Sequence, residues 1–431
     1  MPSLHAVLVK RTSPRLVELL AAALDGSGPA ILPLDAELPR ARLAELVSSF
    51  APDTIEDADG VTTARSDRKV PLAEGTAVIV GTSGSTGLPK GVQLGGAALL
   101  HSARASLARV GARPGQRWLC CLPATYIAGI QVLVRSLAAG TEPVLATRAD
   151  AETVAGSGCA HVSLVPTQLR RLLADRGRPG DKSTPLAGFS SVLLGGAAAP
   201  QSLLDDARAA GIPVVTTYGM TETCGGCVYD GQPLDGVRVM IGDENDPHSA
   251  GGDRIWIGGP VLFSGYRPAG PAGPGGAASP PGSGGPRGDV APDSAALFRT
   301  GDLGRLDESG RLTVRGRADD VINTGGHKVV PGEVAAVLET CPGVRDVAVV
   351  GQPDTEWGER VVAVVVPADR ADPPPLELLR LHVRERLPRY AAPSRVVLVD
   401  AVPMLPSGKH DIARLKLDLL RREQIEAENV T

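Results

Sequence analysis

A glycine-rich stretch containing one lysine offers the first chemistry in this sequence. Residues 81–93 read GTSGSTGLPKGVQ and follow the apolar run TAVIV. Glycine lets a backbone fold closely around phosphate oxygens, and the N–H groups of such a turn attract anions. A Walker loop requires Ser or Thr after its lysine, whereas Gly91 follows Lys90 here. Taken alone the stretch could be a plain surface loop, and otherwise it predicts a phosphate-binding loop of a different kind.

Four further segments place polar side chains next to glycines or after apolar runs. YGMTETCGG begins at Tyr218, and FRTGDLG, beginning at Phe298, has an acid in a tight turn. GRADDVINTGGHKVVPGEV begins at Gly316, and MLPSGKHD, beginning at Met404, has Lys409 in a turn. Each of these segments is weak evidence alone, but their order along the chain is informative.

Together and in this order, the five segments resemble the adenylate-forming superfamily of acyl-CoA synthetases, nonribosomal-peptide adenylation domains and beetle luciferases. The resemblance runs from about Thr76 to Ile412. It implies an AMP-forming acid–thiol ligase that makes acyl-AMP and pyrophosphate from an acid and ATP, and then acyl-CoA and AMP with coenzyme A. Joining a carboxylate to the α-phosphate brings two anions together, so the site must supply positive charge, Mg²⁺ and oriented donors.

The same resemblance assigns ATP to particular residues. Tyr218 would stack on the adenine, Thr221 would hydrogen-bond the α-phosphate, and Glu222 would hold Mg²⁺, for which carboxylate oxygen is a preferred ligand. Asp302 would accept both ribose hydroxyls, and Arg317 would bind the ribose and phosphate. The residues of the opening loop that would hold the β- and γ-phosphates are Thr82, Ser83, Ser85, Thr86 and Lys90.

Lys409 is the predicted catalytic lysine, acting with Thr221 and Glu222. In the superfamily this lysine bridges the carboxylate and the α-phosphate during adenylation, and it leaves when the small domain rotates about a hinge residue, here Asp319. A second face of the small domain then shapes the channel for the CoA thiol. That face would carry Gly325, Gly326, His327 and Lys328. A solvated lysine after a Ser-Gly turn is the alternative for Lys409.

The segment LPATYIAGIQVLVRSLAAG, beginning at Leu122, resembles the substrate-pocket helix of o-succinylbenzoate–CoA ligases of menaquinone biosynthesis. Tyr126 stands where that family usually has histidine, and its phenol can still line an aryl pocket. Gln131 and Arg135 are four residues apart and share a helix face, so Arg135 could receive a second carboxylate. A structural salt bridge is the alternative for this arginine. The resemblance also assigns Gly195 and Gly196 to the substrate pocket.

Three other functions stay open. Another aryl- or acyl-CoA ligase would use the same residues on a different acid. A stand-alone adenylation domain that loads a carrier protein would differ only in its acceptor. A non-enzymatic binder of acyl-adenylates should have lost Lys409, Glu222 or Asp302, and the sequence retains all three.

The elements that must position these residues alternate between two types. Apolar runs rich in Val and Ile, such as 76–80 and 190–194, alternate with segments of helical periodicity. This alternation is typical of α/β layering with largely parallel strands. We predict an α/β fold with a large N-terminal domain of layered sheets and helices and a small mobile C-terminal α+β domain. The large domain, residues 1–318, would bind nucleotide and acid, and residues 319–431 would carry the catalytic lysine.

Residues 265–297 interrupt this pattern. They are rich in Gly and Pro, a composition that neither buries a core nor sustains a strand ladder. A plain interdomain linker is excluded because the acid-bearing segment that follows belongs with the nucleotide site. We therefore predict a flexible surface insertion in the large domain.

Composition narrows the class of protein. The 431 residues are 43% hydrophobic and 21% charged, without the run of about 18 apolar residues that a membrane span needs. The start of the chain lacks a signal-peptide pattern, so we expect a cytoplasmic protein. A net charge of −4 argues against nucleic acid as a partner and favours small molecules, here ATP, a carboxylic acid and CoA. Cys224 and Cys227 have CxxC spacing without a second pair, which favours packed, reduced thiols, and a homodimer is compatible with the sequence.

Overall fold

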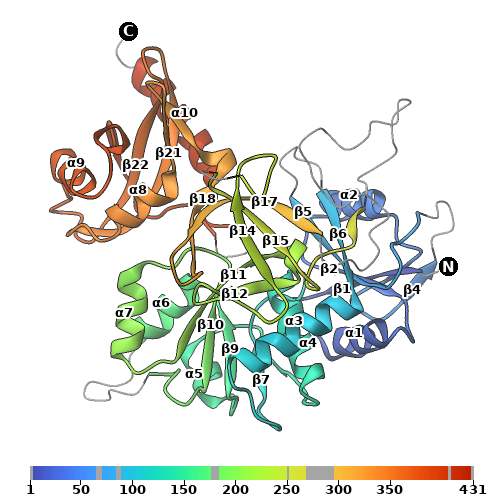
Figure 1. Cartoon of the computed structure of the whole chain (residues 1–431). Helices are drawn as coiled ribbons and strands as arrows, with labels where there is room; N and C mark the ends of the chain where they lie inside the picture. The colour runs from blue at the N-terminus through green and yellow to red at the C-terminus, as the bar shows by residue number, and fades with distance from the viewer. Residues whose placement is uncertain are drawn as a thin grey trace, which may run out of the picture. The chain divides into compact units, whose positions relative to one another are not determined.

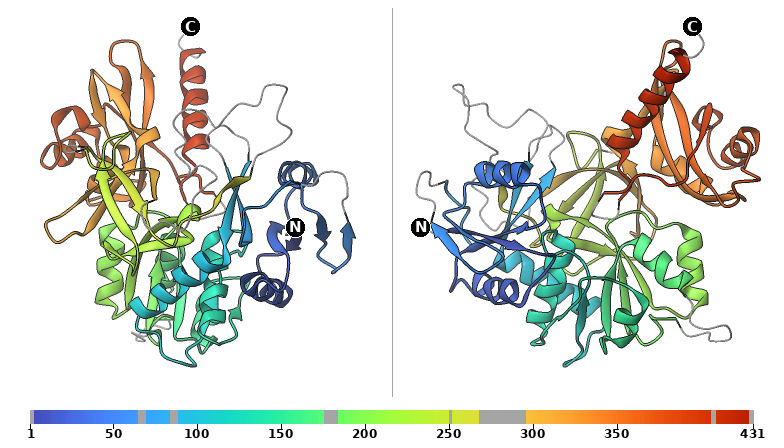
Figure 2. Two further views of the ribbon diagram at one scale, coloured as in Figure 1. Left: turned by 45° about the vertical axis from the view of Figure 1, so that its right-hand side comes forward. Right: turned by 180° about the vertical axis from the view of Figure 1, so that it is seen from behind.

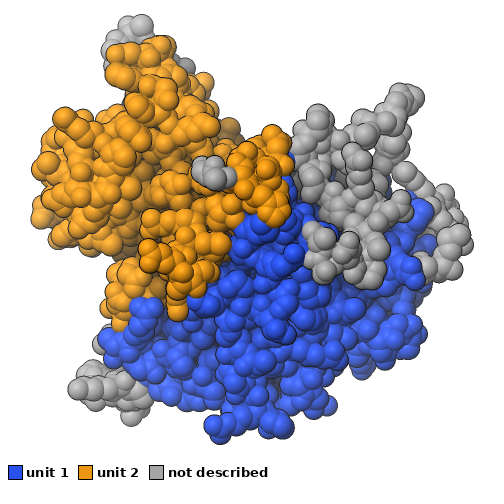
Figure 3. Space-filling model, viewed as in Figure 1, with its two compact units in different colours: residues 1–196, 207–240, 256–299 blue, residues 197–206, 241–255, 300–431 orange. Residues whose placement is uncertain are grey.

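The chain folds into two compact units, which Figure 3 shows in different colours. The computed structural model describes residues 3–64, 70–83, 89–175, 184–249, 252–267, 296–405 and 409–428. Unit 1 comprises residues 1–196, 207–240 and 256–299, and unit 2 comprises residues 197–206, 241–255 and 300–431. Within the described ranges no helix is both long and apolar enough to cross a bilayer. The predicted domain boundary at residues 318/319 stays a prediction.

Unit 1 contains two seven-stranded sheets whose central strands are parallel. The first sheet has the order β16 (Gly265–Arg267), β6 (Pro89–Gly95), β5 (Thr76–Ser83), β2 (Ala30–Asp35), β1 (Leu4–Val9), β3 (Thr54–Glu56) and β4 (Thr62–Ala64). The second has the order β13 (Gln232–Pro233), β12 (Gly225–Tyr229), β11 (Val214–Met220), β10 (Ser191–Leu194), β9 (His161–Leu164), β7 (Trp118–Cys120) and β8 (Val144–Leu145). The predicted α/β layering is confirmed.

Helices cover and separate these sheets. They are α1 (Pro14–Asp25), α2 (Arg40–Phe50), α3 (Gly96–Arg109), α4 (Ile127–Ala138), α5 (Ala151–Gly156), α6 (Pro166–Ala174) and α7 (Gln201–Ala209). Helices α3 and α4 contact each other; α3 packs against strands of both sheets and α4 against the second, and Figure 1 shows them in the layer between. Leu99, Val132 and Val134 are fully buried in this layer. Burial on all sides explains why α4, which carries predicted pocket residues, is apolar over most of its length.

Local signals account for where the first helix starts and stops. The Ser13 side chain accepts a hydrogen bond from the Leu16 N–H at 3.1 Å, and Pro14 occupies the first helical turn. Gly26 ends the helix with a φ of 77°. An N-cap hydroxyl, an early proline and a left-handed glycine are the usual helix boundaries, so α1 is predictable from the sequence alone.

A four-stranded sheet carries the acid-bearing segment. Its order is β14 (Arg238–Gly242), β15 (Arg254–Gly258), β17 (Leu297–Leu306) and β18 (Leu312–Arg317). Strands β17 and β18 are antiparallel, and their register places Asp302 directly opposite Arg317. The hairpin therefore brings together two residues that the sequence assigns to ribose binding.

Unit 2 also contains a five-stranded sheet with helices on both faces. The strands are β20 (His327–Val329), β19 (Ile322–Thr324), β22 (Gly358–Pro367), β21 (Val344–Asp354) and β23 (Arg395–Leu398). Val347 and Val349 pack with α8 (Pro331–Leu338) and α9 (Leu376–Arg384), whereas Ala348 and Val350 pack with α10 (Ile412–Glu428). Successive side chains of a strand point to opposite faces, so a continuous run of valines fits a sheet covered on both sides (Figures 1 and 2).

The predicted start of the Gly/Pro-rich insertion is wrong. Residues 265–267 form β16, which is hydrogen-bonded to β6, and Arg267 is only 1% exposed. The arginine donates to the carbonyls of Phe50 at 2.6 Å and Ala51 at 3.0 Å, so long-range contacts override the local composition. At the other end, Leu297 already belongs to β17. Residues 268–295 of the predicted insertion lie outside the described residues.

Candidate active site

The predicted phosphate loop connects the two strands of a hairpin. Strands β5 and β6 are antiparallel, with Thr82 opposite Lys90, and the Thr82 hydroxyl donates to the Lys90 carbonyl at 3.3 Å. The hairpin places Thr82 and Lys90 side by side at its open end. Ser83 ends β5, while Ser85 and Thr86 lie outside the described residues.

Glu222 lies in a short 3₁₀ helix, η1 (Thr221–Thr223), that follows β11. The Tyr266 hydroxyl donates to Glu222 Oε1 at 2.9 Å, and the Phe263 N–H donates to the Glu222 carbonyl at 2.9 Å. Lys90 Nζ lies 5.6 Å from the centre of the Tyr266 ring. Tyr266 therefore contacts both the predicted metal ligand and the predicted phosphate-binding lysine.

The turn that carries Thr221 is tightly bonded. Thr223 is fully buried, and its hydroxyl interacts with the carbonyls of Met220 at 3.1 Å and Gly225 at 2.7 Å. Cys224 ends the turn with a φ of 52°. Tyr218, the predicted adenine contact, lies on β11 opposite Val228 of β12. The strand and its turn thus place Tyr218, Thr221 and Glu222 within one short rigid segment.

Helix α4 carries the predicted pocket residues Tyr126, Gln131 and Arg135. Tyr126 is the residue before the helix and is 38% exposed. Gln131 is 3% exposed; its side-chain nitrogen donates to the Leu99 carbonyl at 3.5 Å, and its Oε1 has no partner among the described residues. A buried amide oxygen without a partner is costly, which marks this part of the helix as polar and underused.

Arg135 is buried without an acidic partner in the described part of the chain. It is 5% exposed, donates from Nη2 to the Ser163 hydroxyl at 2.8 Å, and lies over the Trp118 ring at 4.4 Å from its centre. Burial lowers the pKa of Arg135, while nearby Tyr229 raises it. The structural salt bridge considered for this residue is therefore absent from the described chain, although the stacking on Trp118 is a structural contact.

His161 completes the stack beneath Arg135. Its ring lies 4.7 Å from that of Trp118, and its nitrogens interact with Ser191 Oγ at 2.8 Å and Gln116 Oε1 at 3.2 Å. Burial, and secondarily the Arg135 charge, lower the pKa of His161 to about 4. The histidine is therefore neutral near pH 7.

This pKa predicts a loss of stability in acid. An unfolded histidine takes up its proton near pH 6.5 and His161 only near pH 4, so its contribution is complete above about pH 6.5 and is lost as the pH falls to about 4. The expected loss is about 3 kcal/mol at most. Urea unfolding at pH 7.5 and 4.5 measures it, with His161→Gln as the comparison. Equal pH slopes for both proteins would contradict this origin.

The remaining predicted pocket residues, Gly195 and Gly196, follow β10 directly. A side chain at Gly195 would collide with Thr217, whose Oγ1 would lie 2.3 Å from the added Cβ. Thr217 belongs to β11, the strand that also carries Tyr218. Gly195 is thus required for the close approach of these two strands, and its role in substrate binding stays a prediction.

The CxxC cysteines are buried thiols. Cys224 and Cys227 are both free and fully buried, which confirms their expected packing. Burial raises the pKa of Cys227 to about 12 and that of Cys224 also rises. A metal-binding or redox-active cysteine instead needs a lowered pKa, because the thiolate is the reactive form. The described residues contain no group of three or more His, Cys, Asp and Glu that could hold a metal.

In unit 2, Arg317 links the predicted ribose ligand to the predicted hinge. Its guanidinium lies 3.5 Å from Asp302 Oδ1 and 3.6 Å from Asp319 Oδ2. Asp302 is 8% exposed, whereas the Asp319 side chain is mostly exposed. Asp302, Arg317 and Asp319 therefore form one polar cluster at the end of the β17–β18 hairpin.

The predicted CoA-channel residues form a two-residue hairpin turn. Gly325 and Gly326 connect β19 and β20 with φ angles of 55° and 79°, the geometry of a type I′ turn. An added Cβ on Gly325 would lie 2.6 Å from the Trp357 ring, so the turn needs glycine for space as well as for φ. The exposed His327 stacks on Tyr390 at 4.2 Å, and Lys328 is exposed.

Lys409 is exposed and lies in a turn before α10. Its carbonyl accepts a hydrogen bond from the Leu405 N–H at 2.8 Å, and Met404 forms an isolated bridge with His410. These bonds close the turn around residues 406–408, which lie outside the described residues. The lysine is thus held at its backbone on a surface turn.

Comparison with known proteins decides the family. Residues 6–267 match the AMP-binding enzyme family, and residues 333–409 match the AMP-binding enzyme C-terminal domain. The chain belongs to the AMP-binding enzyme family. The match to two consecutive domains supports the adenylate-forming reading of the ordered motifs, and the expected α/β fold and superfamily are confirmed.

Three similar proteins place this AMP-binding enzyme more closely. A "Probable 2-succinylbenzoate–CoA ligase" of Mycobacterium tuberculosis is 44% identical over 353 residues, covering 80% of this chain and 85% of that protein. The o-succinylbenzoate CoA synthetase of Bacillus subtilis with the acyl-adenylate OSB-AMP has a TM-score of 0.68 at 28% identity, covering 96% and 83% of the two chains. Its complex with ATP and magnesium has a TM-score of 0.72 at 26% identity, covering 95% and 88%.

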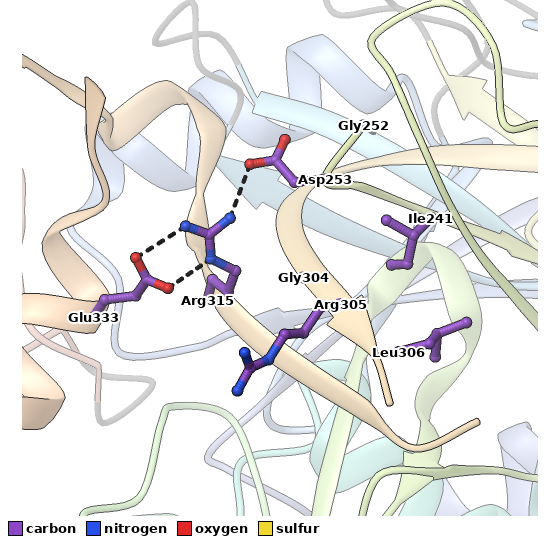
Figure 4. A pocket seen from close by; sticks show the side chains of 8 residues that line it. All are labelled: Ile241, Gly252, Asp253, Gly304, Arg305, Leu306, Arg315 and Glu333. Carbon is purple, nitrogen blue, oxygen red and sulfur yellow. Dashed lines mark hydrogen bonds and ion pairs between the residues drawn. The ribbon is translucent and has the colours of Figure 1, made fainter. Parts of the chain in front are cut away.

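One pocket of this AMP-binding enzyme lies apart from the predicted residues. It has a volume of about 530 Å³ and is lined by Ile241, Gly252, Asp253, Gly304, Arg305, Leu306, Arg315 and Glu333 (Figure 4). Arg315 donates to both oxygens of Glu333 at 2.6 and 3.0 Å and to Asp253 at 3.1 Å. Since these carboxylates neutralise the arginine, the hollow is an ion cluster and not an anion site.

Sequence reasoning missed Tyr266 and the residues around Arg135. Tyr266 stands in a Gly/Pro-rich stretch, and the only local sign of β16 is the apolar segment VLF just before it. Trp118, Ser163 and His161 lie on neighbouring strands β7 and β9, and no spacing rule links them to α4. The rarity of tryptophan and histidine in this chain was the available signal.

Proposed function

We propose that this AMP-binding enzyme is a 2-succinylbenzoate–CoA ligase. The observation that carries the proposal is the 44% identity, over 80% of the chain, with the mycobacterial protein of that name. The geometry supports a dicarboxylate because Arg135 is a buried cation for which the described residues offer no carboxylate. A guanidinium has five donors, and Arg135 Nε has no partner among the described residues.

In the first half-reaction, the acid's carboxylate attacks the α-phosphate of ATP and pyrophosphate leaves. Tyr218 would hold the adenine, Asp302 with Arg317 the ribose, and the β5–β6 loop the departing phosphates. Mg²⁺ would offset the phosphate charge, and Glu222 fits it because Mg²⁺ is commonly held by one or two carboxylates together with substrate phosphates. The bond from Tyr266 uses Oε1 of Glu222, so Oε2 can face a metal. Thr221 and Lys409 would stabilise charge on the reacting groups.

In the second half-reaction, the CoA thiol displaces AMP from the acyl-adenylate. The Gly325–Gly326 turn, with His327 and Lys328 beside it, would border the pantetheine arm, since glycine permits close approach. Rotation about Asp319 would exchange this turn for Lys409. Each described residue in these roles is a proposal for its own segment, and the ordered motifs support it.

The compartment and the assembly are also proposals. All six cysteines are free and buried, which favours a reducing compartment and supports the cytoplasm. A homodimer is the proposed assembly, and light scattering on a sizing column measures it directly.

The proposed function is tested by CoA-dependent AMP release across a panel of aryl and fatty acids. We expect 2-succinylbenzoate to give the highest kcat/KM and a thioester of free CoA as the product. A strong preference for a monocarboxylic acid would contradict the substrate. Thioester formation on a carrier protein but not on free CoA would contradict the acceptor and favour a stand-alone adenylation domain.

A further inference from the structure

Tyr266 is fixed in position by its own strand. β16 pairs with β6 so that Tyr266 lies opposite Val92 and Arg267 opposite Gly91. Next to the tyrosine, the buried Arg267 side chain is bonded to two carbonyls at the end of α2 and just beyond it. The Tyr266 ring also packs against Phe263, with 4.8 Å between ring centres. A ring held by a strand, a neighbouring anchor and an aromatic contact has little freedom to move.

The two functional contacts of Tyr266 use different parts of its side chain. The hydroxyl donates to Glu222 Oε1 at 2.9 Å, and the ring face lies 5.6 Å from Lys90 Nζ. A cation within about 6 Å of an aromatic ring centre is attracted to the ring. Phe263 additionally bonds the Glu222 carbonyl, so residues 263–266 hold both the backbone and the carboxylate of Glu222.

The direction of the hydrogen bond follows from charge. Burial, and next the charge of Glu222, raise the pKa of Tyr266 far above its usual range. The phenol therefore stays protonated and donates, and Glu222 accepts as an ionised carboxylate. An orienting donor on one oxygen fixes the direction of the other, as hydrogen bonds to metal-ligating carboxylates do.

We propose that Tyr266 is a positioning residue that orients Glu222 for magnesium-bound ATP and places Lys90 for the terminal phosphates. The inference rests on the proposed nucleotide-activating function and adds a residue to it. Its hydroxyl acts through Glu222 and its ring acts on Lys90, so the two contributions are separable by substitution.

The test measures ATP binding by calorimetry with α,β-methylene-ATP, once with Mg²⁺ and once with EDTA. The ratio of the two affinities is the magnesium-linked gain. Tyr266→Phe keeps the ring and should reduce this gain about tenfold or more, because loss of a hydrogen bond to a metal ligand typically costs 10- to 100-fold in metal affinity. Its affinity in EDTA should stay within about twofold of wild type, since the contact with Lys90 remains.

Tyr266→Leu removes the ring as well and should also weaken binding in EDTA, by about threefold. If this variant does not fold, Tyr266→Phe still tests the proposal. Tyr229→Phe is the matched control, because Tyr229 is a buried tyrosine whose hydroxyl bonds Ser106 at 2.7 Å. It should leave both affinities unchanged.

A double-mutant comparison separates positioning from a general structural role. In a Glu222→Gln background, adding Tyr266→Phe should cause no further loss of the magnesium-linked gain, because two residues acting through one contact are not additive. Additive losses would overturn the inference, and so would an unchanged gain in Tyr266→Phe. Failure of wild type to activate 2-succinylbenzoate while ATP binding stays magnesium-linked would instead contradict the proposed acid and leave this inference intact.

Discussion

Lys409→Ala is expected to abolish formation of the acyl-adenylate while a supplied acyl-adenylate is still converted to the CoA thioester. Lys409 is exposed on a turn that is closed by the Leu405–Lys409 backbone bond. Removing a positioned cation from a developing negative charge costs on the order of a hundredfold or more in rate. The lysine acts only while the carboxylate meets the α-phosphate, so the thiol step should be spared. Acid-dependent ATP–pyrophosphate exchange measures the first step, and thioester formation from synthetic acyl-adenylate measures the second.

Lys416→Ala provides the matched control for this experiment. Lys416 lies seven residues further along, on α10, and no role is proposed for it. Its replacement should leave both half-reactions unchanged. Equal damage to the two half-reactions in Lys409→Ala would rule out a lysine that serves adenylation alone, and with it the two-arrangement model for this enzyme.

Arg135→Ala should cut kcat/KM for 2-succinylbenzoate roughly ten- to a hundredfold. The diacid has one carboxylate to be activated and a second that must be bound without reacting. Loss of a hydrogen bond to a charged group costs about 1.5 to 3 kcal/mol, which sets this range. The change should fall mainly on KM, because the second carboxylate is bound alike in the ground and transition states. Steady-state kinetics with the diacid and with benzoates that lack the second carboxylate measure it.

The stack under Arg135 requires a structural control. Arg135→Ala also removes the contact with Trp118 and leaves Ser163 without its donor, so some loss of stability is expected. Ser163→Ala removes the same internal hydrogen bond and keeps the cation. It should therefore preserve the preference for the diacid. If Arg135→Ala impairs the diacid and the benzoates equally, the arginine is structural and the proposed acid is wrong, whereas the assignment to the family is unaffected.

Much of the fold followed from local patterns. Ser13, Pro14 and Gly26 mark the ends of α1, and the valine runs of β21 and β22 predict strands buried on both faces. The ordered motifs identified the nucleotide site because their residue types are those that phosphate, ribose and Mg²⁺ require. These signals are contained within short segments, which is why they can be read without coordinates.

Contacts between distant segments were not predictable in this way. Tyr266 reaches Glu222 over 44 residues, and Arg267 bonds Phe50 over 217. Such pairs depend on which strands become neighbours, and the Gly/Pro-rich composition around β16 argued against any strand there. Arg135 was identified by its spacing on α4, but its burial over Trp118 follows from the position of β7.

The Arg315–Glu333 pair has a mechanical consequence. Arg315 precedes the predicted hinge Asp319 in the chain and Glu333 follows it, so the pair closes a ring around the hinge. Any rotation about Asp319 that separates β18 from α8 must break two charge-assisted bonds at once. Both side chains are about 30% exposed, so dissolved salt weakens their attraction. Ionic strength thereby becomes a brake setting on the rotation: dilute buffer holds the arrangement described here, and concentrated salt releases it sooner.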